Sequence, residues 1–263
     1  MSGGVRPVLS LVMPVHNEGA TLREVLEQVG MVDMPVPFEL IVVDDGSTDG
    51  AVDTIDPRWL PNATSVRVVS ARTNRGKGSA LRKGFSMARG DILGVQDADL
   101  EYDPHQIPDL VRPILDGDAD VVFGSRQFGA NASYSFWYTM GNRLISLTAS
   151  MLFDRITTDA YTCDKVMRRD AYEQLELTAD GFEIEAELTG GLLGGGWRYR
   201  EVPISYTARS REEGKKIRPK DGLTAVITLT RFRLRSSLSS ALTKAQGSSA
   251  SIAARPSGRR GSV

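Results

Sequence analysis

Gln96-Asp97-Ala98-Asp99-Leu100-Glu101 directly follows a short apolar segment, Asp91-Ile92-Leu93-Gly94-Val95, which has the pattern of a buried strand. Side chains alternate between faces in an extended segment, so Asp97, Asp99 and Glu101 are predicted to point the same way. Three carboxylates on one face repel one another unless a cation lies between them. Mg²⁺ or Mn²⁺ prefers such oxygen ligands, which predicts a metal site of these three residues. A solvated acidic turn is the alternative, because a lone Asp-x-Asp pair is common.

Strand-like and helical segments alternate through the first half of the chain. Strands are predicted over 7–14, 38–43, 66–70, 92–96 and 121–123. Helices are predicted over 21–29, 51–55 and 79–88, and Thr21 and Glu24 form a candidate capping box for the first of them. Such alternation indicates right-handed crossovers and an α/β fold with a mainly parallel central sheet flanked by helices.

Three of the predicted strands end in polar stretches, which are His16-Asn17-Glu18, Asp44-Asp45-Gly46-Ser47 and Asp97-Ala98-Asp99. Parallel strands bring their carboxyl ends to one edge of the sheet, and open α/β sheets bind ligands at that edge. The three stretches therefore predict a joint site for a nucleotide and a metal ion.

The second half of the chain is less regular. Helices are predicted over 136–153 and 181–193, and strands over 162–167 and 199–206. Apolar residues at helical spacing in the first helix are expected in the core: Tyr138, Leu144, Leu147 and Met151. Three glutamates begin the second helix, where they complement the helix dipole, face solvent or serve catalysis: Glu183, Glu185 and Glu187.

The charge of the chain is unevenly distributed. Residues 209–263 hold 13 Lys and Arg against 3 Asp and Glu, a net charge of +10, whereas residues 1–208 carry −11. Residues 221–235 are predicted to form an amphipathic basic helix on an anionic membrane surface. Its apolar face would consist of Leu223, Val226, Ile227, Thr230 and Leu234. A helix packed back on the sheet is the alternative, and residues 236–263 have the composition of a disordered tail.

Composition is that of an ordinary globular protein, with 41% hydrophobic and 25% charged residues among 263. The longest nearly apolar run, Leu144–Phe153, is too short to span a bilayer. Cys163 is the only cysteine, which excludes an internal disulfide and favours a packing role in a reducing compartment. Together with an N-terminus that lacks a signal-peptide pattern, this predicts a cytoplasmic protein, with a peripheral contact at the inner face of the membrane. No nucleic-acid partner is expected.

Five motifs occur in order: Pro14-Val15-His16-Asn17-Glu18, Val43-Asp44-Asp45-Gly46-Ser47-Thr48-Asp49, Asn74-Arg75-Gly76-Lys77-Gly78, Asp97-Ala98-Asp99-Leu100-Glu101 and Gly124-Ser125-Arg126. This ordered set resembles family 2 glycosyltransferases with the GT-A nucleotide-diphospho-sugar transferase fold. More narrowly, it resembles dolichyl- or polyprenyl-phosphate mannose synthases and their bacterial relatives. The resemblance covers roughly residues 8–220, and the chain departs from the family pattern at His16 and Asp164.

The resemblance implies which residues of this chain bind the sugar donor. The base and ribose would be lined by Pro14, His16 and Glu18, and the base by Val43 and Asp45. The metal and the diphosphate would be held by Asp97, Ala98, Asp99 and Glu101. The acceptor phosphate or the diphosphate would meet Arg126 and Arg143, and the site would be closed by Arg209, Lys215 and Lys216.

The resemblance also implies an organisation and a reaction. Residues 1–235 would be one glycosyltransferase domain, with a nucleotide-binding half (8–126), an acceptor half (127–220) and the basic helix (221–235). The enzyme would use Mg²⁺ or Mn²⁺ to move a hexose, with inversion, from a GDP-mannose or UDP-glucose type of donor to a polyprenyl or dolichyl phosphate. Such a phosphate is largely ionised near neutral pH, so it needs cationic positioning rather than a base.

Two alternative functions stay open, and two others lack support in the sequence. A glycosyltransferase acting on a soluble hydroxyl needs a general base, for which Asp159 or a glutamate of the 182–187 stretch is the candidate. A non-catalytic nucleotide-sugar-binding protein would not need the intact acidic motif. A nucleotidyltransferase lacks support because no Gly-rich basic loop follows the first strand, and nothing places two carboxylates across a sugar pocket as in a glycosidase.

Overall fold

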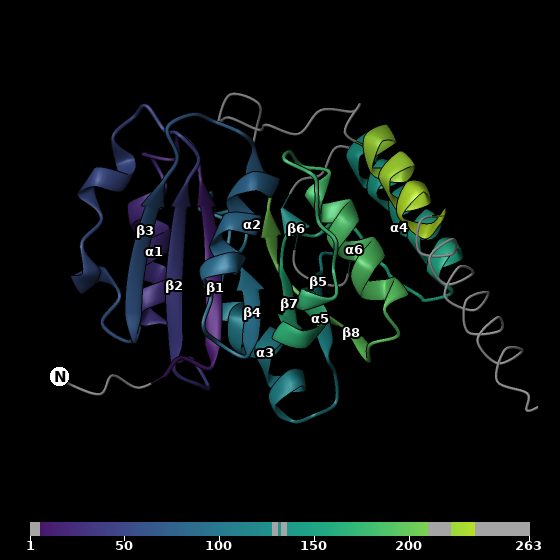
Figure 1. The fold of residues 1–263 in the computed structure, drawn as a ribbon, viewed down its shortest axis with the longest axis horizontal. Coiled ribbons are helices and arrows are strands. Elements are labelled where there is room, and N and C mark those ends of the chain that lie inside the picture. The colour runs from purple at the N-terminus through teal and green to yellow at the C-terminus, as the bar shows by residue number, and fades with distance from the viewer. Residues whose placement is uncertain (1–5, 128–130, 133–135, 210–221, 235–263) are drawn as a thin grey trace, which may run out of the picture.

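A computed structural model describes residues 6–127, 131–132, 136–209 and 222–234. One sheet of seven strands runs through the middle of the molecule with helices on both faces (Figure 1). In spatial order the strands are β3 (Ser65–Ser70), β2 (Phe38–Asp44), β1 (Leu9–Val15), β4 (Ile92–Val95), β7 (Lys165–Arg168), β5 (Val121–Ser125) and β8 (Tyr199–Pro203). Neighbouring strands are parallel except at β7, which is antiparallel to both β4 and β5. The predicted α/β fold with a mainly parallel sheet is confirmed.

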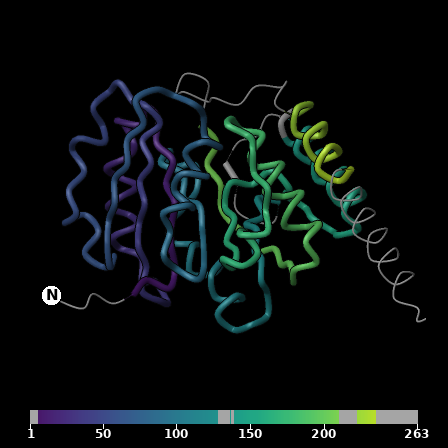
Figure 2. Tube along the Cα trace, viewed as in Figure 1, coloured from purple at the N-terminus to yellow at the C-terminus, as the bar shows by residue number. Residues whose placement is uncertain are grey.

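The remaining elements are helices and one small ribbon. The α-helices are α1 (Leu22–Met31), α2 (Lys77–Met87), α3 (Ile107–Leu115), α4 (Phe136–Phe153), α5 (Arg169–Glu173), α6 (Ile184–Gly194) and a helix over residues 222–234. Short 3-10 helices cover Ala51–Thr54, Pro57–Trp59 and Pro104–Gln106. The ribbon pairs β6 (Asn131–Ala132) with β9 (Tyr206–Thr207). The first four strands along the chain form one end of the sheet, and β7, β5 and β8 form the other (Figure 2).

Alternating side chains of the central strands divide the core into two layers. On β1, Leu11 and Met13 pack with α1 and α3, whereas Val12 faces the layer that contains α2 and α6. All seven residues of β2 are buried, as expected for a parallel strand covered on both faces. This packing fixes the carboxyl ends of β1, β2 and β4 at one edge of the sheet.

Several predicted elements differ from the structure in their ends. The predicted 51–55 helix is a single 3-10 turn, and the predicted 199–206 strand is divided between β8 and β9. The capping box is wrong, since no side chain caps α1. The Thr21 hydroxyl instead donates a hydrogen bond to the carbonyl of Ala98, 2.7 Å away. The start of α1 is thereby tied to the acidic stretch that follows β4.

A third apolar cluster joins α4, α6 and the helix over residues 222–234, and Ile145, Ala149, Ala225 and Leu229 are buried within it. The two outer helices lie side by side at one end of the molecule (Figure 1). The expected core positions of α4 are wrong, because Leu144, Leu147 and Met151 are exposed. The side chain of Tyr138 lies outside the description. Among the described residues, no helix has the length and apolar content needed to cross a membrane.

Candidate active site

One pocket opens at the edge where β1, β2 and β4 end. Nine residues predicted for the site line it: Pro14, His16, Glu18, Asp45, Asp97, Ala98, Asp99, Glu101 and Arg209. The pocket is also lined by residues to which the sequence analysis gave no role, among them Asn74, Lys77, Cys163 and Phe182. Val43 lies in a second pocket that shares Asp45 with the first. Arg126, Arg143 and Asp159 line neither, and Lys215 and Lys216 lie outside the described residues.

The acidic stretch after β4 is not an extension of the strand. β4 ends at Val95, and Leu100 has a left-handed backbone with φ of 60°. The stretch therefore does not follow the simple alternation of a strand, although Asp97, Asp99 and Glu101 all line the pocket. Asp99 accepts a hydrogen bond from the backbone N–H of Glu101, whose own carboxylate accepts one from the Tyr206 hydroxyl at 2.6 Å. Over the described part of the chain, no three His, Cys, Asp or Glu side chains converge as a preformed metal site.

Arg209 places its guanidinium between two loops of the pocket. Nη1 lies 2.9 Å from Oε2 of Glu18, and Nη2 lies 2.9 Å from Oδ2 of Asp99. The backbone N–H of Arg209 donates to Oε1 of Glu101, also at 2.9 Å. Glu18 follows β1 and Asp99 follows β4, so one side chain from beyond β9 links the ends of two central strands.

The pKa of Asp99 is raised to about 7. Burial is the largest cause, followed by the negative charges of Asp97 and Glu101, whereas the Arg209 guanidinium acts in the opposite direction. The cationic side chains of the pocket thus compensate its negative charge only in part. A further cation with a preference for carboxylate oxygen fits this donor set.

A chain of alternating charges lies behind the pocket. Lys77, the first residue of α2, has its Nζ 2.8 Å from Asp97 and 3.1 Å from Glu185 of α6. Glu185 in turn lies 2.6 Å from Nζ of Lys165 on β7. Burial opposes the charge on Lys77, but Asp97 and Glu185 outweigh it and hold its pKa well above the ordinary value. Glu185 is buried, so its expected positions in solvent or as a free base are both wrong.

Asp45 supports the loop that precedes α2. Its two carboxylate oxygens accept the backbone N–H groups of Arg75, at 2.9 Å, and Gly76, at 2.6 Å. Gly76 has φ of 108°, and a Cβ atom there would lie 2.4 Å from the carbonyl oxygen of Asp180. Only glycine fits this position without strain. Asp45 therefore sets the loop that carries Lys77 into the pocket.

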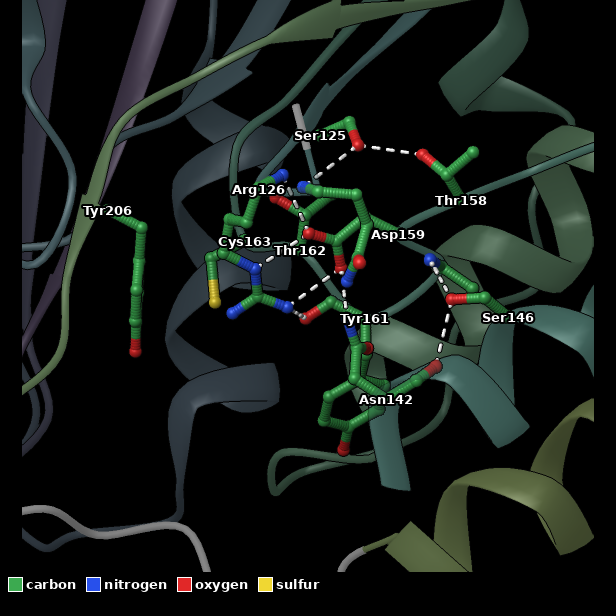
Figure 3. A network of polar contacts seen from close by, with 12 residues as sticks. Ser125, Arg126, Asn142, Ser146, Thr158, Asp159, Tyr161, Thr162, Cys163 and Tyr206 are labelled. Atoms are coloured by element: carbon green, nitrogen blue, oxygen red, sulfur yellow. Dashed lines mark hydrogen bonds and ion pairs between the residues drawn. The ribbon is translucent and has the colours of Figure 1, made fainter. Parts of the chain in front are cut away.

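Arg126 and Asp159 form a buried two-pronged ion pair (Figure 3). The guanidinium Nε and Nη2 lie 2.7 and 2.8 Å from the two oxygens of Asp159, and Asn142 of α4 donates to the same carboxylate. The guanidinium also lies over the Tyr206 ring, 5.0 Å from its centre. Burial alone would raise the pKa of Asp159, but Arg126 outweighs it and lowers that pKa. Asp159, the candidate base for a hydroxyl acceptor, is thus paired with Arg126, the residue expected to meet a phosphate.

Two other predicted positions have distinct surroundings. Arg143 lies on the exposed surface of α4. Asp164, where the chain departs from the family pattern, is buried beside Gly124 at the start of β7. Burial and the nearby Asp97 raise the pKa of Asp164 well above its ordinary value.

The mainly parallel sheet, with an acidic pocket at the ends of its central strands, defines the GT-A class of nucleotide-sugar transferase folds. The chain belongs to glycosyl transferase family 2, whose model matches residues 10–176. The matched segment contains the ends of β1, β2 and β4 and stops before Glu185 and Arg209.

The curated relatives are named as sugar transferases. The chain is 30% identical over 213 residues to a hexosyltransferase of low-salt glycan biosynthesis from Haloferax volcanii, covering 79% of this chain and 50% of that protein. It is 28% identical to a dolichol-phosphate mannosyltransferase from Pyrococcus furiosus, covering 79% and 58%. A dolichol-phosphate mannosyltransferase from Mycosarcoma maydis is also 28% identical, covering 86% and 80%. The chain thus spans only about half of the first two relatives.

Solved structures share the fold. Glucosyl-3-phosphoglycerate synthase from Mycobacterium tuberculosis, in complex with Mn²⁺, UDP-glucose and phosphoglyceric acid, is similar with a TM-score of 0.62 and 25% identity. The match covers 87% of this chain and 80% of that one. Staphylococcus aureus TarS in complex with UDP-GlcNAc has a TM-score of 0.60 and 16% identity, which shows the fold alone; that match covers 85% of this chain and 66% of that one.

Asp159→Asn is expected to lower the free energy of unfolding by about 3–5 kcal/mol near neutral pH, because it leaves the buried Arg126 guanidinium without its counter-charge. Denaturant unfolding measures this. The lowered pKa of Asp159 means that its stabilisation is present above the unfolded-state pKa and is lost as pH falls through the folded-state pKa. The difference in the free energy of unfolding between wild type and Asp159→Asn should therefore become smaller at acidic pH. Asp170→Asn, in the half-exposed pair with Arg168, is the control and should cost less than about 1 kcal/mol.

Proposed function

We propose that the chain is a metal-dependent, inverting glycosyltransferase that moves a hexose from a nucleotide-sugar to a polyprenyl or dolichyl phosphate. The choice of acceptor rests on the ion pairs, hydrogen bonds and pKa shifts of the residues that could act as a general base. Asp159 is held by Arg126 and Asn142, and Glu185 by Lys77 and Lys165. Burial and the nearby Asp97 raise the pKa of Asp164, which favours the protonated form of that carboxyl. A hydroxyl acceptor needs a base, whereas an ionised phosphate does not.

The sugar donor would bind in the pocket at the ends of β1, β2 and β4. Asp97 and Asp99 would hold Mg²⁺ or Mn²⁺, which supplies positive charge to the leaving diphosphate. The Mn²⁺ and UDP-glucose in the similar mycobacterial synthase support this assignment. Lys77 and Arg209 would add positive charge from the protein as negative charge builds on the diphosphate. Asp45 would act indirectly, by fixing the loop before α2.

The acceptor would approach from the α4 side. The Arg126 guanidinium is held in one orientation by Asp159, Tyr206 and Tyr102, so it can position a phosphate without first being ordered. The relatives named as dolichol-phosphate mannosyltransferases support an acceptor of this kind. GDP-mannose is therefore the first donor to test, with UDP-glucose as the second.

The outer helices offer a surface for the membrane that carries such an acceptor. α4 exposes an apolar stripe at spacings of three and four residues: Phe136, Met140, Leu144, Leu147 and Met151. The helix over residues 222–234 adds Leu223, Ile227 and Leu234 beside it. The predicted membrane face of that helix is corrected in one respect, because Val226 and Thr230 are half-buried. We propose that this two-helix apolar surface lies on an anionic bilayer, with Arg143, Arg231 and Arg233 at the headgroups.

Asp99→Ala is expected to abolish turnover of the sugar donor with either Mg²⁺ or Mn²⁺. Removing a carboxylate with a raised pKa relieves repulsion, so the thermal midpoint should not fall. Asp91→Ala, at the opposite end of the same strand and exposed, is the matched control and should retain activity. Normal turnover by purified Asp99→Ala would contradict the assigned metal role.

Asp45→Ala is expected to raise the KM for the nucleotide-sugar by about tenfold or more, from the loss of two charge-assisted hydrogen bonds worth roughly 1.5–3 kcal/mol each. Asp45 lies at the expected nucleoside end of the donor, which does not change in the reaction, so kcat should fall by a smaller factor than KM rises. Some loss of kcat is expected because the same loop carries Lys77. Initial-rate kinetics separate the two constants. A fall in kcat at unchanged KM would show that Asp45 acts on the chemical step instead.

Leu144→Glu combined with Leu147→Glu is expected to abolish co-sedimentation with anionic liposomes at low salt. Both side chains are exposed, so the fold should be retained, and wild-type binding should weaken as salt rises. Met31→Glu, equally exposed but on α1, is the control. Absence of wild-type binding at low salt, combined with transfer to a water-soluble hydroxyl acceptor, would replace the lipid acceptor by a soluble one.

A further inference from the structure

Arg209 occupies the place in the pocket where a cation is needed. Its guanidinium contacts carboxylates from two different strand ends, Glu18 and Asp99, each at 2.9 Å. All three side chains are largely buried, with 17% of Arg209, 10% of Glu18 and 16% of Asp99 exposed. A positive charge from the protein itself thus already compensates part of the negative charge of the acidic site.

The guanidinium is not fully satisfied in this position. Its Nε is buried and has no hydrogen-bond partner among the described residues, and the Glu101 carboxylate is 3.8 Å away from it. A buried N–H without a partner costs roughly 1–3 kcal/mol. The phosphate oxygens of a nucleoside diphosphate are strong acceptors for a guanidinium. Arg209 therefore has a better partner once the sugar donor is bound.

A divalent cation and this guanidinium compete for Asp99. Nη2 of Arg209 already contacts Oδ2 of Asp99. A divalent cation bound to the same carboxylate would lie close to the guanidinium, and the two positive charges would repel each other strongly. Displacing Arg209 without offering it another anion would leave a buried charge unpaired, which is costly. The two cations can be accommodated together only if an additional anion enters the pocket.

We propose that Arg209 excludes the metal until the sugar donor binds. The diphosphate draws the guanidinium away from Asp99, and the freed carboxylate then binds Mg²⁺ or Mn²⁺. No covalent bond changes; one ion pair is exchanged for two new ionic contacts. The inference rests on the proposed function, and it makes Arg209 a positioning residue that couples metal binding to nucleotide binding.

Coupling of this kind is reciprocal. If the nucleoside diphosphate raises the affinity for Mn²⁺ by some factor, Mn²⁺ must raise the affinity for the nucleoside diphosphate by the same factor. Removing Arg209 should therefore have two opposite effects. Mn²⁺ alone should bind more tightly, while the nucleotide should lose both a direct partner and its cooperation with the metal.

The test measures free Mn²⁺ by electron paramagnetic resonance, with no nucleotide and then with saturating GDP or UDP. Arg209→Gln is expected to bind Mn²⁺ alone at least tenfold more tightly than wild type, and the enhancement by nucleotide should shrink by a similar factor. Arg23→Gln, on the exposed surface of α1, removes the same charge elsewhere and should change nothing.

Unchanged or weaker Mn²⁺ binding by folded Arg209→Gln overturns the inference. If that variant does not fold, Arg209→Lys decides in its place. Lysine keeps the charge but cannot bridge two carboxylates as a guanidinium does, so this variant should also bind Mn²⁺ alone more tightly than wild type. Failure of the proposed function has a different signature. Wild type would then bind neither GDP nor UDP at any Mn²⁺ concentration, while the comparison of Mn²⁺ alone would still report on Arg209.

Discussion

Compensation of buried carboxylates by cations from distant segments organises this pocket. Removing a carboxylate from water costs several kcal/mol even after relaxation, so each one near the core needs a partner. Asp97 is paired with Lys77, Glu185 with Lys165, and Glu18 with Arg209. Because the partners come from α2, β7 and the segment after β9, these ion pairs also hold the loops of the pocket in place. Asp99 is the exception: its raised pKa shows that Arg209 compensates it incompletely.

The sequence predicted the sheet and its ligand edge well because both depend on local patterns. Apolar runs such as β2 cannot be solvent-exposed, and a polar stretch such as Asp97-Ala98-Asp99 must follow the strand that precedes it. The alternation rule failed beyond the end of β4 at Val95: five residues further on, Leu100 has a left-handed conformation, and the next residue, Glu101, accepts a hydrogen bond from Tyr206. That contact joins residues 105 positions apart, and no local pattern contains it.

The ion-pair partners of the charged residues could not be predicted from the sequence either, because they too lie far apart in the chain. Lys77 lay in a quoted motif without a role, because its buried partner Glu185 is on α6 in the other half of the chain. α4 shows a related failure. Its apolar residues at helical spacing indicate one apolar face. Spacing alone does not show whether that face packs against the protein core or lies exposed on the surface. The structure buries Ile145 and Ala149 and leaves Leu144 and Leu147 exposed.

The ion pair between Arg126 and Asp159 limits what attracts an acceptor phosphate. A guanidinium that shares its charge with a carboxylate provides little net potential, so Arg126 contributes orientation rather than long-range attraction. The attraction must come from unbalanced positive charge, which is concentrated in residues 209–263 with a net charge of +10. For the proposed anionic acceptor, attraction and final placement would thus belong to different segments. The family model ends at residue 176, before either Arg209 or this basic segment begins. The determinants that distinguish acceptors within the family are therefore expected in the part of the chain that the shared pattern does not reach.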